Sequence, residues 1–101
     1  MNSALRLTKM SFFCYLLECA DGTYYAGWST DPVRREQQHN AGFGARYTRT
    51  RRPVKLVYIE EQPDRVGAMR RERQIKGMTR AKKETLISNT MVAKCATTFT
   101  P

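Results

Sequence analysis

An arginine and the only histidine of the chain stand four positions apart, at Arg35 and His39. Residues at i and i+4 of a helix share a face, so both side chains can reach one ligand. The planar arginine fork donates two parallel hydrogen bonds to phosphate, and a histidine with a pKa near 6.5 can relay a proton or donate to the same group. A plainer interpretation of His39 is a helix-end residue that complements the helix dipole. The neighbouring Arg34 is expected to point elsewhere, into solvent.

A single acid lies in the most basic segment of the chain. It is Glu72, and arginines occupy positions 70, 71 and 73. Helical periodicity places Glu72 on the same stripe as Ile75, which is the core-facing side. A buried carboxylate costs free energy unless it pairs with a cation or holds a metal ion. Two interpretations stay open: an ion pair with a neighbouring arginine, or a carboxylate aimed at a functional site.

Two aromatic runs, residues 12–19 and 23–28, bring Tyr15 and Tyr25 together. The Asp21-Gly22 pair between them is a strong signal for a β-hairpin. Closing the hairpin places the two tyrosines close together on neighbouring strands. Gly27 ends the second strand, where a missing Cβ permits close approach of a ligand or another backbone. The alternative is that both tyrosines are simply half-buried strand aromatics.

The other elements follow from capping residues and periodicity. Helices are predicted over residues 32–40, 65–76 and 80–88, with starts at Asp31, Asp64 and Thr79 and stops at Gly42 and Gly77 for the first two. Residues 43–53 are predicted as a loop rich in arginine. Residues 54–61 form a third strand, whose apolar centre suits the middle of the sheet. The order ββαβαα predicts an α+β fold with helices packed on a small three-stranded, mixed or antiparallel sheet.

The charge of the chain indicates its kind of partner. The chain has 101 residues, a net charge of +9 from 18 Lys+Arg against 9 Asp+Glu, and a pI of about 10, which favours nucleic acid. An anionic membrane surface is the competing partner, but the basic helices lack the Trp/Phe/Leu face of such anchors. No apolar run is long enough to span a bilayer.

The cysteines and the two ends of the chain indicate the redox setting and the extent of the domain. Cys14 and Cys19 point to opposite faces of one strand and cannot bridge, so a reduced cytosolic setting is the simpler interpretation. Residues 1–11 carry no signal-peptide pattern and are expected to be an N-terminal extension, in which either Met1 or Met10 can be the native start. Residues 12–88 form the domain, and residues 89–101 are expected to be a disordered tail.

These pieces, in this order, resemble the GIY-YIG nuclease domain. The resemblance rests on Phe13-Cys14-Tyr15, Tyr25-Ala26-Gly27, Arg35 and Glu72, and covers about residues 12–87. It is closest to small stand-alone bacterial members and to structure-selective junction nucleases, whose Tyr-Leu-Leu and Arg-Arg-x-Gln-Gln-His-Asn stretches are similar to those at 15–17 and 34–40. The naming tripeptides are degenerate, since Phe13 and Cys14 replace Gly and Ile and Ala26 replaces Ile. The asparagine that some members place after the acidic helix has no clear counterpart.

The resemblance implies a metal-dependent endonuclease acting on DNA in repair or recombination. By resemblance, Glu72 holds one divalent cation, Mg²⁺ or Mn²⁺, and Arg35 stabilises the transition state. Tyr15 or Tyr25 orients or deprotonates the attacking water, with a slight preference for Tyr15 as the base. His39 is a secondary candidate for that proton or for phosphate binding, and Gly27 has a structural role.

The basic side chains are expected to grip the DNA backbone without reading sequence. They are Arg34, Arg46, Arg49, Arg51, Arg52, Arg70, Arg73 and Lys76. A protein partner or a homodimer would supply targeting, and a DNA substrate implies a nucleoid-associated cytoplasmic location. The alternative hypothesis is a non-catalytic basic module that holds nucleic acid or recruits a repair complex.

Overall fold

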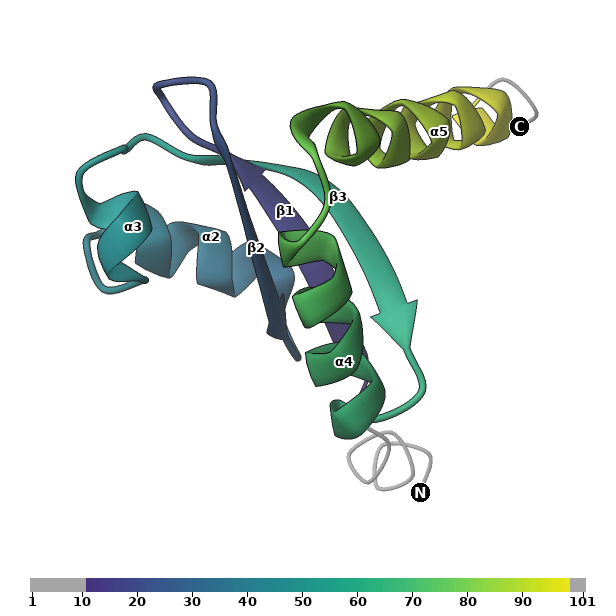
Figure 1. Cartoon of the computed structure of the whole chain (residues 1–101), viewed down its shortest axis with the longest axis horizontal. Coiled ribbons are helices and arrows are strands. Elements are labelled where there is room, and N and C mark those ends of the chain that lie inside the picture. The colour runs from purple at the N-terminus through teal and green to yellow at the C-terminus, as the bar shows by residue number, and fades with distance from the viewer. Residues whose placement is uncertain (1–10, 99–101) are drawn as a thin grey trace.

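A three-stranded antiparallel sheet forms the centre of the molecule (Figure 1). The computed structural model describes residues 11–98, and its strands are β1 (Phe12–Glu18), β2 (Tyr24–Ser29) and β3 (Lys55–Gln62). β1 pairs antiparallel with both neighbours in the order β2-β1-β3, which confirms the α+β class. Residues 1–10 and 99–101, which include most of the predicted N-terminal extension and the end of the predicted tail, lie outside the described residues.

The central strand is not the one that the sequence suggested. The prediction that the third strand lies in the middle is wrong, because β3 is an edge strand and β1 is central. Four consecutive buried residues, 14–17, allow β1 to face apolar layers on both sides. β3 carries the exposed Ile59, which an edge strand tolerates and a strand buried on both faces does not.

The hairpin between β1 and β2 turns at the predicted residues. Gly22 has φ of +85°, a conformation that glycine adopts without a steric penalty. Asp21 Oδ1 accepts hydrogen bonds from the backbone N–H and the hydroxyl of Thr23, at 3.1 and 2.6 Å. In the resulting register Tyr15 faces Gly27 and Leu17 faces Tyr25, so Tyr15 and Tyr25 are diagonal neighbours on one face.

Four helices complete the described chain: α2 (Pro32–Asn40), α3 (Arg46–Arg49), α4 (Arg65–Lys76) and α5 (Arg80–Thr98). The predicted bounds of α2 and α4 are confirmed. Asp31 and Asp64 accept the backbone N–H groups of Arg34 and Gly67, as N-caps do. The predicted loop 43–53 contains the short α3, and α5 extends beyond its predicted end near residue 88.

The helices cover both faces of the sheet (Figure 1). On one face Cys14 and Leu16 pack with Ala68 and Ile75 of α4, and α5 adds to the edge of this cluster. On the other face Tyr15 and Leu17 form a smaller cluster beside α2 and α3. β2 runs between α2 and α4, so side chains from both layers can meet at its exposed edge (Figure 1).

No helix among residues 11–98 combines the length and the apolar character that a bilayer span requires.

Candidate active site

The ring of Tyr15 lies directly over Gly27. A Cβ built on Gly27 would stand 2.5 Å from the Tyr15 hydroxyl oxygen and 2.6 Å from Cζ, so only glycine leaves room for this ring. The predicted close approach at Gly27 is therefore made by Tyr15 itself. The residue is 1% exposed, and its hydroxyl lies 3.2 Å from Nε2 of His39.

His39 is buried at the end of α2 and bonded through both ring nitrogens. Thr48 Oγ1 lies 2.7 Å from Nδ1 and 3.0 Å from the carbonyl oxygen of Ala45. If the Thr48 hydroxyl donates to that carbonyl, it must accept from Nδ1–H, which leaves Nε2 as the acceptor for the Tyr15 hydroxyl. We infer this tautomer because the Tyr15 hydroxyl, the His39 ring and the Thr48 hydroxyl then each donate one hydrogen bond to the next acceptor. Burial, with a smaller contribution from the Arg35 charge, lowers the pKa of His39 from 6.5 to about 4.

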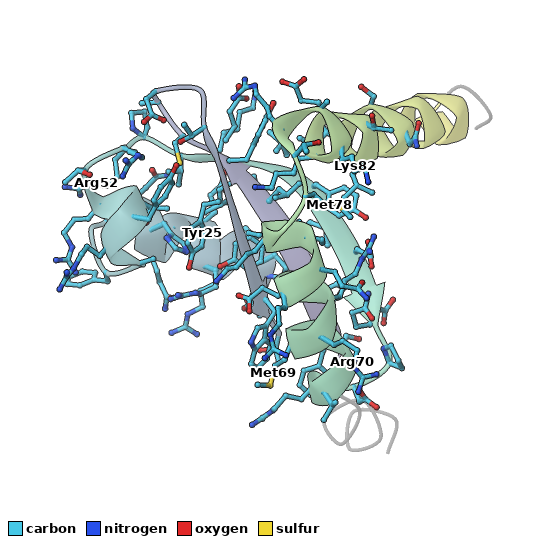
Figure 2. The ribbon with its side chains drawn as sticks, in the orientation of Figure 1. Tyr25, Arg52, Met69, Arg70, Met78 and Lys82 are labelled. Atoms are coloured by element: carbon cyan, nitrogen blue, oxygen red, sulfur yellow. The ribbon has the colours of Figure 1, made fainter. Side chains whose placement is uncertain are left out.

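Tyr25 stands beside His39 but is reachable from outside. The two ring centroids are 5.2 Å apart, and on its other side Tyr25 stacks on Tyr47 at 6.1 Å and 23°. The Arg51 guanidinium lies 3.9 Å from the Tyr47 centroid and holds that ring in place. In Figure 2 Tyr25 is seen on the α2 and α3 side of β2.

An open cavity of about 390 Å³ lies against Tyr25. It is lined by Tyr24, Tyr25, Ala26, Tyr47, Lys76 and Lys83. Tyr25 is therefore the tyrosine that a ligand can reach.

Both tyrosines are neutral in the free protein. Burial raises the pKa of Tyr15, and the nearby Arg35 cation opposes this. Burial also raises the pKa of Tyr25, the Glu72 charge adds to the rise, and Arg35 again opposes it. Arg35 and Glu72 thus act on these phenols with opposite signs from two different helices. A phenolate at either position requires further positive charge brought by a ligand.

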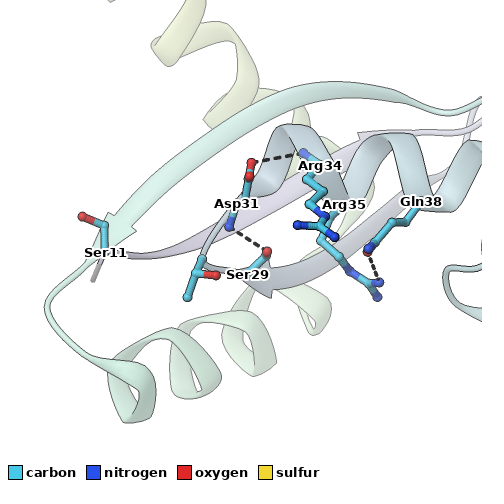
Figure 3. A pocket seen from close by; sticks show the side chains of 7 residues that line it. Ser11, Ser29, Asp31, Arg34, Arg35 and Gln38 are labelled. Atoms are coloured by element: carbon cyan, nitrogen blue, oxygen red, sulfur yellow. Dashed lines mark hydrogen bonds between the residues drawn. The ribbon is translucent and has the colours of Figure 1, made fainter. Parts of the chain in front are cut away.

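Arg35 lies on α2 at the rim of a polar pocket of about 480 Å³ (Figure 3). Its Nη1 donates to Gln38 Oε1 at 2.8 Å, which fixes the side chain one helical turn from its own Cα. Arg34 lines the same pocket and is exposed, together with Ser29 and the capping Asp31. Two guanidinium groups therefore face one opening that is large enough for a phosphate.

Glu72 reaches the site from the opposite layer. Its carboxylate is 22% exposed and lies 3.7 Å from Nζ of Lys76, which is itself 5.9 Å from the Tyr25 ring centroid. The arginine ion pair considered for Glu72 forms elsewhere: Arg71 binds Glu60 of β3 at 2.8 and 3.2 Å. A long, exposed contact with lysine leaves the Glu72 oxygens available to another cation.

A metal ion at this site would have one protein ligand. No cluster of three or more His, Cys, Asp or Glu side chains suited to a metal is found within the described part of the chain. One carboxylate fits Mg²⁺ or Mn²⁺, because such ions are held by one or two carboxylates together with waters and substrate phosphate oxygens. The donor set therefore fits a cation that arrives with its substrate.

The predicted DNA-contacting arginines fall into two groups. Arg51 donates to Asp21 and to the Tyr47 carbonyl, and Arg52 donates to the Arg49 and Asn40 carbonyls, so both are engaged within the protein. Lys76 is exposed and forms the long ion pair with Glu72. The remaining arginines are exposed and make no side-chain hydrogen bond or ion pair among residues 11–89: Arg34, Arg46, Arg49, Arg70 and Arg73. Figure 2 shows Arg70 pointing outward from α4.

Sequence reasoning did not single out Thr48, Tyr47 or Gly44. A Cβ on Gly44 would overlap the His39 ring, so the loop passes tightly over the imidazole there. The glycines on either side of Phe43 are the one available signal of such an approach. Thr48 and Tyr47 lie in an arginine-rich stretch with no regular period, which hides a buried threonine.

Comparison with known proteins gives a family match and several relatives. The family model described as the GIY-YIG catalytic domain matches residues 11–85. A UPF0213 protein of Halobacterium salinarum is 54% identical over 72 residues, which cover 71% of this chain and 94% of that protein. A UPF0213 protein of Syntrophus aciditrophicus is 50% identical over 76 residues, covering 74% and 87%.

Two solution NMR structures are similar as well. The UPF0213 protein BH0048 of Bacillus halodurans is 46% identical with a TM-score of 0.50, over 78% of this chain and 84% of that one. The protein EF2693 of E. faecalis is 37% identical with a TM-score of 0.56, over 83% and 90%.

Proposed function

Because the chain belongs to the GIY-YIG family, we propose that it is a metal-dependent endonuclease that hydrolyses DNA phosphodiester bonds in repair or recombination. One observation carries the proposal. Tyr15, Tyr25, Arg35 and Glu72 come from four different elements. Both tyrosines lie beside His39, and the charges of Arg35 and Glu72 act on both phenols. A protein that only holds nucleic acid has no evident need for this set.

The two tyrosines have different roles in this proposal. Tyr25 contacts the attacking water, because it lines an open cavity, whereas the buried Tyr15 holds His39 and packs on Gly27. This reverses the preference for Tyr15 as the base. The raised pKa of Tyr25 means that it orients water in the free protein and accepts a proton only when cations are added nearby.

Arg35 stabilises charge on the transferring phosphoryl group. Its side chain is held by Gln38 at the mouth of the polar pocket, so little conformational entropy is lost when it binds phosphate. His39 is neutral above pH 4 or so and acts as a neutral hydrogen-bond partner of Tyr15. His39 is therefore a positioning group, and it does not supply a proton to the reaction from the free enzyme.

Glu72 would hold the divalent cation, Mg²⁺ or Mn²⁺, on the α4 side of the site. When bound, the cation neutralises the scissile phosphate and the leaving oxygen as a Lewis acid. Lys76 beside Glu72 adds a positive charge near the Tyr25 ring. The protein side chains otherwise bind phosphate and orient water.

DNA is the substrate that the surface charge favours. Exposed arginines on α2, α3 and α4 would bind backbone phosphates. The location that this substrate implies is the cytoplasm, at the nucleoid. Targeting to a particular DNA structure would come from a protein partner or a homodimer. The second candidate is a basic binding module without catalysis, which the charge alone would support.

Replacing Glu72 by Gln tests the function. Glu72→Gln should reduce Mn²⁺-dependent cleavage of plasmid and branched DNA at least 100-fold, because the metal loses its one protein carboxylate. DNA affinity should stay equal or rise, since a repelling charge is gone. The melting temperature should hardly change, because the exposed Lys76 pair is worth about 1 kcal/mol or less.

The matched control is Glu61→Gln, which removes an exposed carboxylate from β3, away from the site. It should cleave like the wild type. Wild-type cleavage by Glu72→Gln would remove the metal role, and absence of cleavage by the wild-type protein with intact DNA binding would favour the binding module.

A further inference from the structure

Phe43 is the most exposed large apolar side chain among the described residues, at 80%. It lies in the segment between α2 and α3, outside both core clusters. We infer that Phe43 is a base-stacking contact for bound DNA, held beside the active site on a rigid loop. The inference rests on the proposed function only for the identity of the ligand.

The backbone around Phe43 is fixed although its side chain is free. The N–H of Phe43 donates to the Gln38 carbonyl at 2.9 Å, and the N–H of Gly42 donates to that of His39 at 3.1 Å. Gly42 has φ of +92° and lies against the Arg52 guanidinium, which also binds the Asn40 and Arg49 carbonyls. An aromatic ring on such a loop loses little freedom when it binds.

On the other side of Phe43 the loop is fixed by the active site itself. Gly44 packs so closely on the imidazole of His39 that no Cβ fits between them. The backbone nitrogen of Ala45 also lies close to Nδ1 of His39, at 3.4 Å. Because this loop packs directly on the imidazole, DNA bound beside His39 would lie close to the loop.

The charge around Phe43 identifies the kind of ligand. No acidic residue occurs between Glu36 and Glu60 in the sequence, whereas Arg46 and Arg49 follow closely on α3 and are exposed. A hollow of about 380 Å³ lies beside this loop, because Arg52, which lines it, also lies against Gly42. Its other lining residues are Asn40, Arg49, Thr50 and Pro53. A planar ring next to exposed guanidinium groups suits a nucleobase and its phosphates.

A protein partner fits this surface less well. Protein interfaces are depleted of charge at their cores and join several apolar side chains, whereas Phe43 is flanked by two glycines and by arginines. The other exposed large apolar residues lie on different elements: Val33 on α2, Tyr47 on α3, Ile59 on β3, and Val66 and Met69 on α4. A single exposed aromatic ring is suited to stack on a single nucleobase.

The test compares two single-stranded probes of equal length and charge, an oligothymidylate and an abasic oligonucleotide without bases. Phe43→Ala should weaken binding of the oligothymidylate roughly 5- to 150-fold and leave binding of the abasic probe unchanged. Phe43→Trp should retain wild-type affinity because it keeps an aromatic face. The melting temperature should not move, since the side chain is exposed.

Val66→Ala is the matched control, because Val66 is 60% exposed on α4. Equal affinity of Phe43→Ala and wild type for the oligothymidylate, or an equal loss on both probes, would overturn the inference. A monomer–dimer change in Phe43→Ala with unchanged DNA affinity would overturn it too. The nuclease proposal fails separately: it falls if the wild-type protein does not cleave DNA with Mn²⁺, whatever Phe43 does.

Discussion

Burial sets the protonation states of Tyr15 and His39 and so limits what this pair can do. Burial raises the pKa of Tyr15 and lowers the pKa of His39 to about 4. Both shifts oppose transfer of the phenol proton to Nε2 in the free protein. The hydrogen bond between them positions both rings, and proton transfer along it requires charges that arrive with the substrate.

The lowered pKa of His39 predicts a pH dependence of stability. His39 stays neutral in the folded protein, while the unfolded chain takes up a proton below its ordinary pKa of 6.5. Its contribution is therefore complete above pH 6.5 and is lost as the pH falls toward 4, by about 3 kcal/mol in the free energy of unfolding. Urea denaturation across this range measures the loss. In His39→Asn the slope between these pH values should flatten, and an unchanged slope would assign it to other groups.

Removing each tyrosine hydroxyl should separate positioning from chemistry. Tyr15→Phe leaves Nε2 of buried His39 without its donor and should destabilise the fold by about 1–3 kcal/mol. Tyr25→Phe should leave stability within about 1 kcal/mol and reduce single-turnover cleavage by roughly 10² to 10⁴ with DNA binding retained. Denaturation and single-turnover cleavage of both variants measure the split. The opposite pattern would return the role in water activation to Tyr15.

At the scale of elements, local signals gave the correct bounds of α2 and α4, missed α3 and failed on strand order. Asp31 and Asp64 cap α2 and α4 through hydrogen bonds to residues three positions ahead, a pattern that the sequence contains in full. Which strand is central depends on pairing between distant segments. Both β1 and β3 contain a run of apolar residues. Such a run does not indicate which of the two strands has a neighbour on each side.

The same distinction applies to the site. Tyr15, Tyr25, Arg35 and Glu72 lie on regular elements at spacings that the sequence displays. Thr48 reaches His39 because the chain between α2 and α3 folds back over the imidazole, and nothing local predicts that path. Arg51 and Arg52 were predicted as DNA contacts because the sequence does not show that the fold places backbone carbonyls within hydrogen-bond distance of their guanidinium groups.

The packing of β1 on β2 predicts that Gly27 tolerates no side chain. In Gly27→Ala the new methyl group would meet the Tyr15 hydroxyl oxygen at 2.5 Å, and the ring would have to move away from His39. Overpacking of this kind costs about 1–3 kcal/mol, and cleavage should fall with it. Thermal denaturation and a cleavage assay measure both effects. Gly77→Ala is the control, since its nearest contact would be 3.6 Å and its φ is −82°, so its stability should not fall.

At the scale of the whole molecule, some of the basic side chains behind the net charge of +9 form ion pairs within the protein, and others are exposed to solvent. Arg71 joins α4 to β3 through Glu60, and Arg51 joins the α3 segment to the hairpin turn through Asp21. Arg46 and Arg49 make no side-chain hydrogen bond or ion pair to another residue among 11–89. Arg46 and Arg49 lie on α3, on the same side of the sheet as Tyr25, whereas Arg70 and Arg73 lie on α4, which covers the other face.

This division predicts which arginines control the salt dependence of DNA binding. With six to eight phosphate contacts, the logarithm of the binding constant should fall with log salt at a slope of roughly −5 to −7. Replacing Arg46 and Arg49 together by Ala should flatten the slope by about two units, one for each lost contact, without changing the melting temperature. Replacing Arg51 and Arg52 together by Ala should leave the slope unchanged and lower the melting temperature, because their guanidinium groups are bound to Asp21 and to backbone carbonyls.

Fluorescence anisotropy over a range of salt concentrations measures the slope, and thermal denaturation of each variant measures the melting temperature. Equal slopes in the two double variants would show that all four arginines reach phosphate, and a slope near zero in the wild type would mean that the charge serves another partner.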